Sequence, residues 1–510
     1  MVWLVGRFGP VGKLPFMKTT PRLTGPLALL ALLPCAAAYS ATAPAAAPAP
    51  AATLVATATE TDGLPTEWID PDTGHRIVRL SREDNTQSLY FHQNPFTPDG
   101  TRLVVTVPSG IETINLQTHE IKKVALGTAP TQRVDTHDAT PADQRIGHVV
   151  SGRKTPTVYY TKGFDVMATN LDTGVSRKIC TLPNELFWGA GFTVNADETL
   201  LAGAGDAADG PLGAIGPNWT GNQALGQRMA ALVPMVLYTI NIQTGEIKKF
   251  FRAERDWLNH VQFSPTDPKL LMFCHEGTWS QVDRIWQINV VPESYTVQPG
   301  DTLDKVAAAH GTYAAMVKYT AGLTADALTP GQKILLPPGP PRLIHQRTMP
   351  GEIAGHEFWG ADGKNAWYDL QTPQTQVFWV GGMNLATGEH IRYSLPKNEW
   401  SVHFNVSPDG KFFAGDGGGP NSVARGDNGQ WVFLFTPDPT TATTIKAGAE
   451  DVKSMQFKAE RLVNLAKHDY GLEPNVSFSP DMKWIIFRSN MLGAAHGSQV
   501  FAVEIAKAAK

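Results

Sequence analysis

One turn signature recurs along the chain and constrains its fold more than any other feature. A Ser/Thr-Pro-Asp-Gly type of turn follows an aromatic or aliphatic residue and precedes an apolar β-type run, in four clear and three weaker copies. The copies are FTPDG (96–100), HVVSGRK (148–154), VNADE (194–198), FSPTD (263–267), WGADG (359–363), VSPDG (406–410) and FSPDM (478–482). No helical period is sustained between them, so the pattern indicates short strands and an all-β fold.

A second marker recurs as NLQTHE at 115, NLDTGV at 170, NIQTGE at 241 and NLATGE at 384, and is typical of hairpins between outer strands. Units of roughly 40–70 residues that each carry one turn predict a seven-bladed β-propeller. Because the second and third copies are weak, six or eight blades are the alternatives. A large β-sandwich is less favoured, since it would not repeat one signature seven times.

Equivalent positions on the innermost strands of a propeller converge on its axis. Each turn is preceded by an aromatic or aliphatic residue, such as Phe96 or Phe263. The position three residues before that residue is occupied, in chain order, by Gln93, Gly147, Gly191, His260, His356, His403 and Asn475. Histidine makes up 14 of the 510 residues, so three histidines at one position of seven predict a functional cluster. A single histidine among aromatic residues is, by contrast, more often a satisfied core residue.

Glu473 lies two residues before Asn475 and therefore on the same strand face. Imidazole, amide and carboxylate groups suit Mn²⁺, Zn²⁺, Fe²⁺ or Ca²⁺. The predicted metal ligands are His356, His403, Glu473 and Asn475. An imidazole without a metal could act as a general base, because its pKa lies near neutrality. The candidates for substrate binding are His92, Gln93, His275, Trp279 and Arg488.

Five stretches resemble the oligogalacturonate lyases, seven-bladed propellers that cleave pectin fragments. They are DPDTGHRIVRLS (70–81), YFHQNPFTPDGTRLV (90–104), WLNHVQFSPTDPKLLMFCHEGTWSQVDRIW (257–286), GHEFWGADG (355–363) and LEPNVSFSPDMKWIIFRSN (472–490). The resemblance implies β-elimination: a base removes the C5 proton of a uronic acid, the O4 group leaves, and a divalent metal, Mn²⁺ foremost, stabilises charge on the carboxylate. It implies that His260 is the base and that His356 binds the metal.

The chain departs from the family at two places. The Gln-x-x-His-x-His metal motif of the last blade reads Tyr470, Glu473 and Asn475 here, so His403 or His468 is expected to supply an imidazole. The catalytic arginine of the family falls near Val236, and Arg228 and Arg284 are the catalytic candidates in its place, with Arg488 as a further one. A related uronate oligosaccharide is therefore an alternative substrate. The alternative function is a non-catalytic propeller that binds wall or uronate glycan fragments.

Residues 294–338 interrupt the propeller, which is expected to span 67–293 and 339–510. The segment YTVQPGDTL…LTPGQKILLP (295–337) resembles a LysM domain, a βααβ unit that binds N-acetylglucosamine polymers such as peptidoglycan or chitin. The resemblance implies attachment of the enzyme to cell-wall glycan. A LysM domain that has lost its glycan and acts as a spacer is the alternative.

The N-terminal segment is typical of an exported protein. Residues 1–38 are predicted to be an upstream extension and a secretory signal from Met17, followed by an Ala/Pro-rich linker over 39–66. A periplasmic or extracellular protein is expected, with only weak indications of a lipoprotein anchor at Cys35. No transmembrane segment is expected in the mature chain. The net charge of −4 argues against a nucleic-acid partner. Cys274, in an apolar run, is expected to be a buried free thiol.

Overall fold

The computed structural model describes residues 55–59, 62–129, 144–187, 191–207, 227, 229–420, 422–424 and 429–508. Contacts divide the chain into residues 1–51 and residues 52–510, and the second unit holds every described element. The predicted signal in residues 1–38 and the predicted catalytic Arg228 lie outside the described residues.

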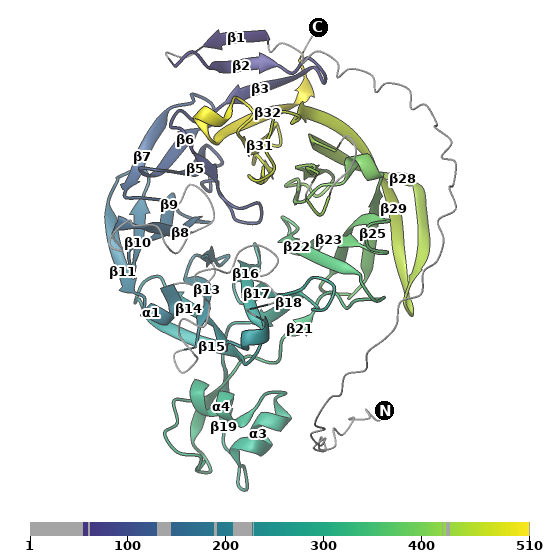
Figure 1. Ribbon diagram of the computed structural model, residues 1–510. Coiled ribbons are helices and arrows are strands. Elements are labelled where there is room, and N and C mark those ends of the chain that lie inside the picture. The colour runs from purple at the N-terminus through teal and green to yellow at the C-terminus, as the bar shows by residue number, and fades with distance from the viewer. Residues whose placement is uncertain are drawn as a thin grey trace, which may run out of the picture. The chain divides into compact units, whose positions relative to one another are not determined.

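Within the second unit, the described strands form seven antiparallel blades around a central axis (Figure 1). Blade one contains β4 Gln87–Ser88, β5 Arg102–Val107, β6 Gly110–Asn115 and β7 Ile121–Leu126. Blade two contains β8 Ile146–Ser151, β9 Thr157–Lys162, β10 Asp165–Asn170 and β11 Ser176–Thr181. The short helix α1 Asn184–Phe187 leads into blade three, which contains β12 Thr193–Val194, β13 Leu200–Asp206, β14 Met235–Asn241 and β15 Ile247–Ala253.

Blade four contains β16 Trp257–Phe263, β17 Leu270–Glu276, β18 Ile285–Asn289 and β21 Arg342–Leu343. Blade five contains β22 Ile353–Trp359, β23 Asn365–Gln371, β24 Phe378–Asn384 and β25 His390–Leu395. Blade six, after the 3₁₀ turn Lys397–Glu399, contains β26 Phe404–Val406, β27 Phe413–Gly415, β28 Trp431–Ala447 and β29 Glu450–Asn464. Blade seven contains β30 Ser477–Phe478, β31 Trp484–Ser489, β32 Gln499–Lys507 and β3 His75–Arg79, with a 3₁₀ turn at Ala494–His496.

The seven-bladed propeller predicted from the turn signature is confirmed. Each copy of the signature follows or ends the innermost strand of one blade and leads into the second strand. The second marker also forms the hairpins expected of it, because its asparagine side chain accepts backbone hydrogen bonds from the residues two and three positions later. These asparagines are Asn115, Asn170, Asn241 and Asn384.

The chain closes its ring by pairing an N-terminal strand with a C-terminal one. Strand β3 lies antiparallel to β32, with Ile77 opposite Val503, and so completes blade seven. Two further strands, β2 Pro65–Ile69 and β1 Val55–Thr59, extend this sheet outward. The linker predicted over 39–66 is therefore wrong for its last part, since Val55–Thr59 pair with the outer edge of β2.

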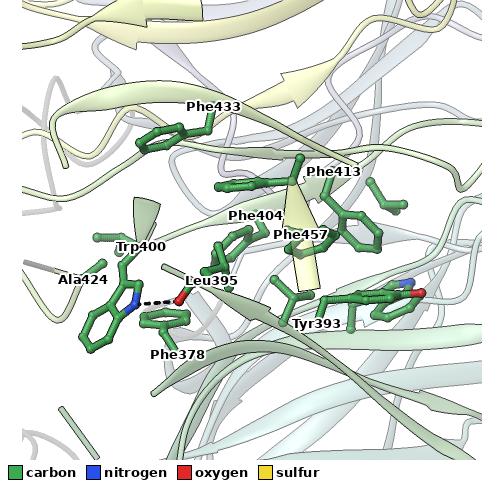
Figure 2. Packing of buried hydrophobic residues seen from close by; sticks show 14 of the residues in the cluster. Phe378, Tyr393, Leu395, Trp400, Phe404, Phe413, Ala424, Phe433 and Phe457 are labelled. Carbon is green, nitrogen blue, oxygen red and sulfur yellow. Dashed lines mark hydrogen bonds between the residues drawn. The ribbon is translucent and has the colours of Figure 1, made fainter. Parts of the chain in front are cut away.

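Apolar clusters between neighbouring blades hold the ring together. The largest lies between blades five and six and is rich in aromatic side chains, among them Phe378, Tyr393, Phe404, Phe413 and Phe457 (Figure 2). The long hairpin β28–β29 adds to this contact, because β29 pairs in parallel with β25 of blade five. Blades five and six thereby share one continuous sheet.

The LysM module is inserted between β18 and β21 of blade four and has the predicted βααβ order. Its elements are β19 Glu293–Thr296, α3 Leu303–Ala309, α4 Ala314–Thr320 and β20 Lys333–Leu336. The module has its own apolar core, which includes Leu303, Val306 and Val317. The hydroxyl of Tyr313, at the start of α4, donates a hydrogen bond of 3.2 Å to the carbonyl of Arg252 on β15. Among the described residues, no helix has the length and apolarity needed to cross a membrane.

We expect the pairing of β3 with β32 to make a large contribution to the free energy of unfolding of the propeller. Ile77 on β3 is 1% exposed, and Ile77→Ala should lower the free energy of unfolding by about 2–5 kcal/mol through lost burial and the cavity left behind. Val175→Ala, at a position 66% exposed in a hairpin of blade two, is the matched control and should change it by less than about 0.5 kcal/mol. Chemical denaturation followed by tryptophan fluorescence measures both. Equal effects would contradict the role of β3 in closure.

Candidate active site and metal centre

The innermost strands carry β-bulges at the positions that face the axis. In blade four the pairing of β16 with β17 slips between Asn259 and Gln262, and His260 has a φ of 45°. In blade five the same slip contains His356, whose φ is 44°. A left-handed conformation costs a residue other than glycine about 1–3 kcal/mol and persists where the surroundings impose it. Bulges also redirect side chains, so each bulge here sets the direction of one imidazole.

Blade two shows the same bulge and corrects the predicted alignment. There the slip lies between Gly147 and Val150, and the left-handed residue is His148, with a φ of 51°. The equivalent of His260 is therefore His148 and not Gly147. Strand β8 runs to Ser151, so the turn of this blade starts one residue later than the sequence pattern indicated.

Three of the axial histidines are held in the same way. In each, the ring nitrogen Nδ1 faces a carboxylate, which accepts a hydrogen bond, so Nδ1 carries the proton and the Nε2 lone pair is left for other chemistry. The pairs are His260 with Glu357 at 3.1 Å, His356 with Asp369 at 3.2 Å and His403 with Asp416 at 2.8 Å. Such carboxylate–histidine pairs are the usual support of imidazoles that bind metals or act as bases.

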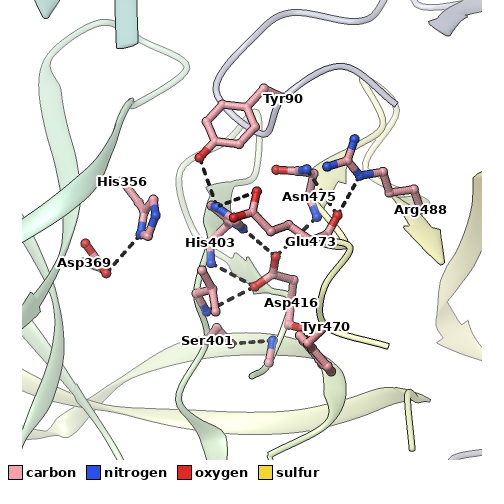
Figure 3. Close-up of polar contacts among 12 residues, drawn as sticks. Tyr90, His356, Asp369, Ser401, His403, Asp416, Tyr470, Glu473, Asn475 and Arg488 are labelled. Carbon is pink, nitrogen blue, oxygen red and sulfur yellow. Dashed lines mark hydrogen bonds and ion pairs between the residues drawn. The ribbon is translucent and has the colours of Figure 1, made fainter. Parts of the chain in front are cut away.

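Two of these imidazoles converge with side chains of the last blade (Figure 3). The ring centroids of His356 and His403 lie 4.6 Å apart. The Nε2 atom of His403 is 3.9 Å from a carboxylate oxygen of Glu473 and accepts a 3.2 Å hydrogen bond from the hydroxyl of Tyr90. Asn475 is buried beside them, and its Oδ1 atom has no hydrogen-bond partner among the described residues. The four predicted metal ligands therefore come from three adjacent blades to one region.

Asp416 is the centre of the hydrogen bonds in this region. Its carboxylate accepts from the backbone N–H groups of Val402, His403 and Asn475 at 3.1, 2.8 and 3.3 Å, besides the imidazole of His403. Burial lowers the pKa of His403, but the carboxylates of Asp416 and Glu473 outweigh it and leave that pKa above its ordinary value. Asp416 thus joins blades six and seven and orients His403.

The donor set fits a hard or borderline divalent ion. It offers two imidazole nitrogens from His356 and His403, the carboxylate of Glu473 and the amide oxygen of Asn475, a combination of nitrogen and oxygen that suits Mn²⁺. The unpartnered amide oxygen of Asn475 is the observation that favours a ligand here, since buried polar atoms are rarely left without one.

The other last-blade candidates are occupied elsewhere. The hydroxyl of Tyr470 donates to the backbone carbonyl of Asp416 at 2.9 Å. Both ring nitrogens of His468 are hydrogen-bonded, Nδ1 with the hydroxyl of Ser489 and Nε2 with the carbonyl of Leu472. Burial lowers the pKa of His468 to about 4. Of the two histidines considered as a replacement imidazole, His403 is therefore the one at the site.

His260 lies in a separate charged group in blade four. Its Nε2 atom is 3.9 Å from Glu276, whose carboxylate accepts a 2.6 Å hydrogen bond from Arg284. Burial lowers the pKa of His260, but Glu357 and Glu276 together outweigh burial and raise it above its ordinary value. This is the electrostatic setting of an imidazole that accepts a proton and is stabilised once protonated.

Arg284 and Trp279 connect this group to His356. The buried guanidinium of Arg284 stacks over the ring of Trp279 at 4.5 Å, and the rings of Trp279 and His356 form a T-shaped contact at a centroid distance of 4.9 Å. Gly355 leaves room for the stack, because a Cβ atom there would lie 3.2 Å from Trp279 and 3.3 Å from Arg284. The stacked pair is thus fixed between the two halves of the site.

The remaining candidates differ in where the structure places them. The His92 ring lies 5.4 Å from that of His260, and burial, followed by the nearby positive charges of His260 and His403, holds the pKa of His92 well below its ordinary value. The side chain of Gln93 accepts a hydrogen bond from the backbone N–H of Tyr90 and so stabilises the loop that contains Tyr90, His92 and Gln93. Arg488 donates to the backbone carbonyl of Glu473 at 2.6 Å, which positions that residue.

His275 is not brought to the site. Cys274 and Glu276 face His260, and successive residues of a strand point to opposite faces. His275 therefore stacks on Trp286 at a centroid distance of 4.9 Å, on the other side of the blade. Val236, where the arginine of the family was expected, is a buried core residue of β14.

Residues 65–298 match the sequence model of the oligogalacturonate lyase family, and residues 295–337 match that of the LysM domain. The first match ends where the second begins, which agrees with the insertion in blade four. The chain is therefore similar to the oligogalacturonate lyases from β2 to β18 and to the LysM domain over the insertion.

Two curated relatives extend the similarity beyond the insertion. The chain is 22% identical over 434 residues to an oligogalacturonate lyase of Dickeya dadantii, covering 82% of this chain and 92% of that protein. It is 22% identical over 438 residues to an oligogalacturonide lyase of Pectobacterium atrosepticum, covering 83% and 92%.

Solved structures show the same fold. An oligogalacturonate lyase in complex with manganese matches with a TM-score of 0.59 and 20% identity, covering 86% of this chain and 96% of that one. An oligogalacturonate lyase from Vibrio parahaemolyticus matches with a TM-score of 0.60 and 19% identity, covering 87% and 97%.

Sequence reasoning missed most of the carboxylates that support the imidazoles of this candidate site. Asp369 and Asp416 each follow their histidine by 13 residues; Asp369 lies on the second strand of its blade, and Asp416 directly follows the second strand of its blade. This equal spacing could have revealed the two aspartates, because it places a carboxylate opposite His356 and another opposite His403. Glu357 adjoins His356 in sequence but reaches His260 of the neighbouring blade, which no spacing indicates.

We expect Asp416→Asn to weaken metal binding at the candidate centre. An amide at this position removes the negative charge that orients His403, so the affinity for Mn²⁺ should fall by about 10–100-fold, and the pKa of His403 should fall in the metal-free protein. Isothermal calorimetry with Mn²⁺ measures the first effect and imidazole NMR titration the second. Asp409→Asn, in the exposed turn of the same blade, is the control. Unchanged Mn²⁺ affinity in Asp416→Asn would contradict this assignment.

Proposed function

We propose that this chain is a lyase that cleaves oligogalacturonate or a related uronate oligosaccharide by metal-assisted β-elimination. The observation that carries the proposal is the set of three axial imidazoles, each presenting Nε2 because a carboxylate holds Nδ1. Two of them converge with Glu473, and the third lies between two carboxylates. The names of the relatives, and the manganese complex of one of them, support the same reaction class.

The metal ligands in this proposal are His356, His403, Glu473 and Asn475, and Mn²⁺ is the first candidate ion. A divalent ion there would supply Lewis-acid stabilisation of the charge that develops on the uronate carboxylate. Asp369 and Asp416 hold the two imidazoles in the tautomer that leaves Nε2 unprotonated. Arg488 holds the backbone of Glu473 in place.

His260 is the proposed base. Its Nδ1–H group donates to Glu357, so Nε2 has the lone pair that accepts the C5 proton of the uronic acid. As the C5–H electron pair forms the C4–C5 double bond, the O4 group leaves with the electrons of the C4–O4 bond. The imidazolium produced is stabilised by Glu357 and Glu276, and Arg284 fixes Glu276 in position.

Arg284 and Trp279 are suited to hold an acidic sugar beside the base. The Nε and Nη2 atoms of Arg284 are buried and have no hydrogen-bond partner within the described parts of the chain. They are therefore available to a carboxylate, the group that a guanidinium binds best. The half-buried ring of Trp279 lies next to them and is suited to contact the sugar.

We expect His260→Ala to lower kcat/KM by about 10²–10⁴-fold, the usual contribution of a general base. The assay follows the ultraviolet absorbance of the 4,5-unsaturated product formed from digalacturonate and trigalacturonate with Mn²⁺. His275→Ala is a matched control, since His275 lies on the neighbouring strand but on its opposite face, and it should keep activity within a few-fold. Full activity in His260→Ala would overturn the assignment of the base.

A non-catalytic propeller that binds uronate or wall glycan is the second candidate function. It is favoured by the changed last-blade positions, where Tyr470 is engaged with the backbone of Asp416 and Glu473 and Asn475 stand in place of histidines. Binding of digalacturonate by calorimetry, with no unsaturated product under any divalent ion, would support this function over the lyase.

We further propose that the LysM module attaches an exported enzyme to N-acetylglucosamine-containing wall glycan. The family match covers the whole module, and its separate apolar core makes it a complete unit. The predicted signal in residues 1–38 supports export to the periplasm or the outside of the cell.

We expect the chain to co-sediment with insoluble peptidoglycan or chitin. A chain in which a short Gly/Ser loop replaces residues 294–338 should lose this binding while it keeps lyase activity on soluble substrate, because the propeller strands β18 and β21 flank the insertion. Cellulose, which lacks the acetamido groups, is the control polymer. Equal sedimentation of both chains would show that the module is a spacer.

A further inference from the structure

Cys274 lies where two other blades have a carboxylate. In β17 it pairs with Asn259, the residue before the bulged His260. In blade five the residue at the same register is Asp369, which pairs with Gly355 before the bulged His356. Asp369 binds the imidazole of its blade, whereas His260 takes its carboxylate, Glu357, from the neighbouring blade. Cys274, which stands at the position of Asp369, therefore places a thiol beside the imidazole of His260, in addition to the carboxylate of Glu357.

Together His260, Cys274 and Glu357 form a compact group of potential ligands. One ligand atom from each residue lies within 4.8 Å of the others. Cys274 and Glu357 are completely buried, and His260 is the member that solvent reaches, with 14% of its side chain exposed. The Oε2 atom of Glu357 has no hydrogen-bond partner in the described residues, so this carboxylate has a free oxygen inside the group.

The chemistry of this group differs from that of the manganese candidates. A thiolate favours soft or borderline ions such as Zn²⁺ and Cd²⁺ over Mn²⁺, and imidazole and carboxylate complete a set that Zn²⁺ commonly uses. Burial raises the pKa of Cys274 well above its ordinary value, so the free protein holds a thiol, whose proton an entering ion would release to solvent.

The charges of the side chains around this group favour the binding of a divalent cation. Once Cys274 is a thiolate, it and the carboxylates of Glu276 and Glu357 carry three negative charges, and Arg284, which binds Glu276, carries one positive charge. A divalent cation would bring the buried group to neutrality, which is the arrangement that burial favours.

We propose that His260, Cys274 and Glu357 form a second cation site, selective for thiophilic divalent ions. It is separate from the proposed manganese ligands, of which it shares none. An ion bound there uses the imidazole of His260 and therefore prevents it from accepting a proton. If the proposed function holds, Zn²⁺ and Cd²⁺ are inhibitors that compete with the base rather than with Mn²⁺.

The test is a titration of the metal-free full chain with Cd²⁺ in the presence of excess Mn²⁺, followed by the ultraviolet charge-transfer absorbance of cadmium–thiolate bonds. Cys35→Ser/Cys180→Ser is the background, because it leaves Cys274 as the one cysteine of the sequence. We expect a saturable band of one thiolate per chain in this background, and no band when Cys274→Ser or Cys274→Ala is added. Glu357→Gln in the same background should weaken Cd²⁺ binding by at least about tenfold.

A band that survives in both Cys274 variants, or no band in the background chain, would overturn the proposal. So would displacement of Cd²⁺ by Mn²⁺. Thermal unfolding shows whether the variants are folded, and the two replacements at Cys274 guard against a defect of one of them. The absorbance does not depend on turnover, so the cation site and the lyase activity can fail independently.

Discussion

The hydrogen bond between an imidazole Nδ1–H and a buried carboxylate is the interaction on which the site depends. It occurs at His260, His356 and His403, and in each it determines which nitrogen remains available. A histidine without such a partner would populate both tautomers and several ring orientations. The carboxylates are costly to bury, and that cost is tolerated because the imidazoles and backbone N–H groups pair with them.

Two of these carboxylates also bind a group of another blade, so the complete site exists only in the closed ring. Glu357 of blade five binds His260 of blade four, and Asp416 of blade six receives the backbone N–H of Asn475 in blade seven. Blade seven is itself completed by β3 from the start of the fold. The geometry of the site therefore depends on ring closure and on the packing between blades. A change that separates β3 from β32 is expected to disturb Glu473 and Asn475 first.

Much of the fold could be predicted because the propeller repeats its local signals. Proline and aspartate mark the four clear inner turns, and an asparagine marks four outer hairpins, so repeated local signals supported one conclusion. The site could be predicted in part, since His260, His356 and His403 occupy one repeated position. The error at Gly147 shows the limit: one extra strand residue before the turn shifted the alignment by one, and the bulge put His148 at the equivalent place. The prediction that His275 binds substrate did not allow for strand geometry, since adjacent residues of a strand face opposite sides and His275 points away from the site.

The sequence by itself indicated seven blades, with six or eight as alternatives, and the residue types near the axis, because these follow from local turn chemistry and period-two strands. The place of the insertion followed from the resemblance of residues 295–337 to a LysM domain. Only the tertiary structure decided which carboxylate serves which histidine, that His403 and not His468 stands beside Glu473, and that Cys274 lies against His260. These contacts join residues of different strands and blades, and their geometry depends on bulges, inter-blade packing and ring closure, none of which is encoded in the spacing along one strand.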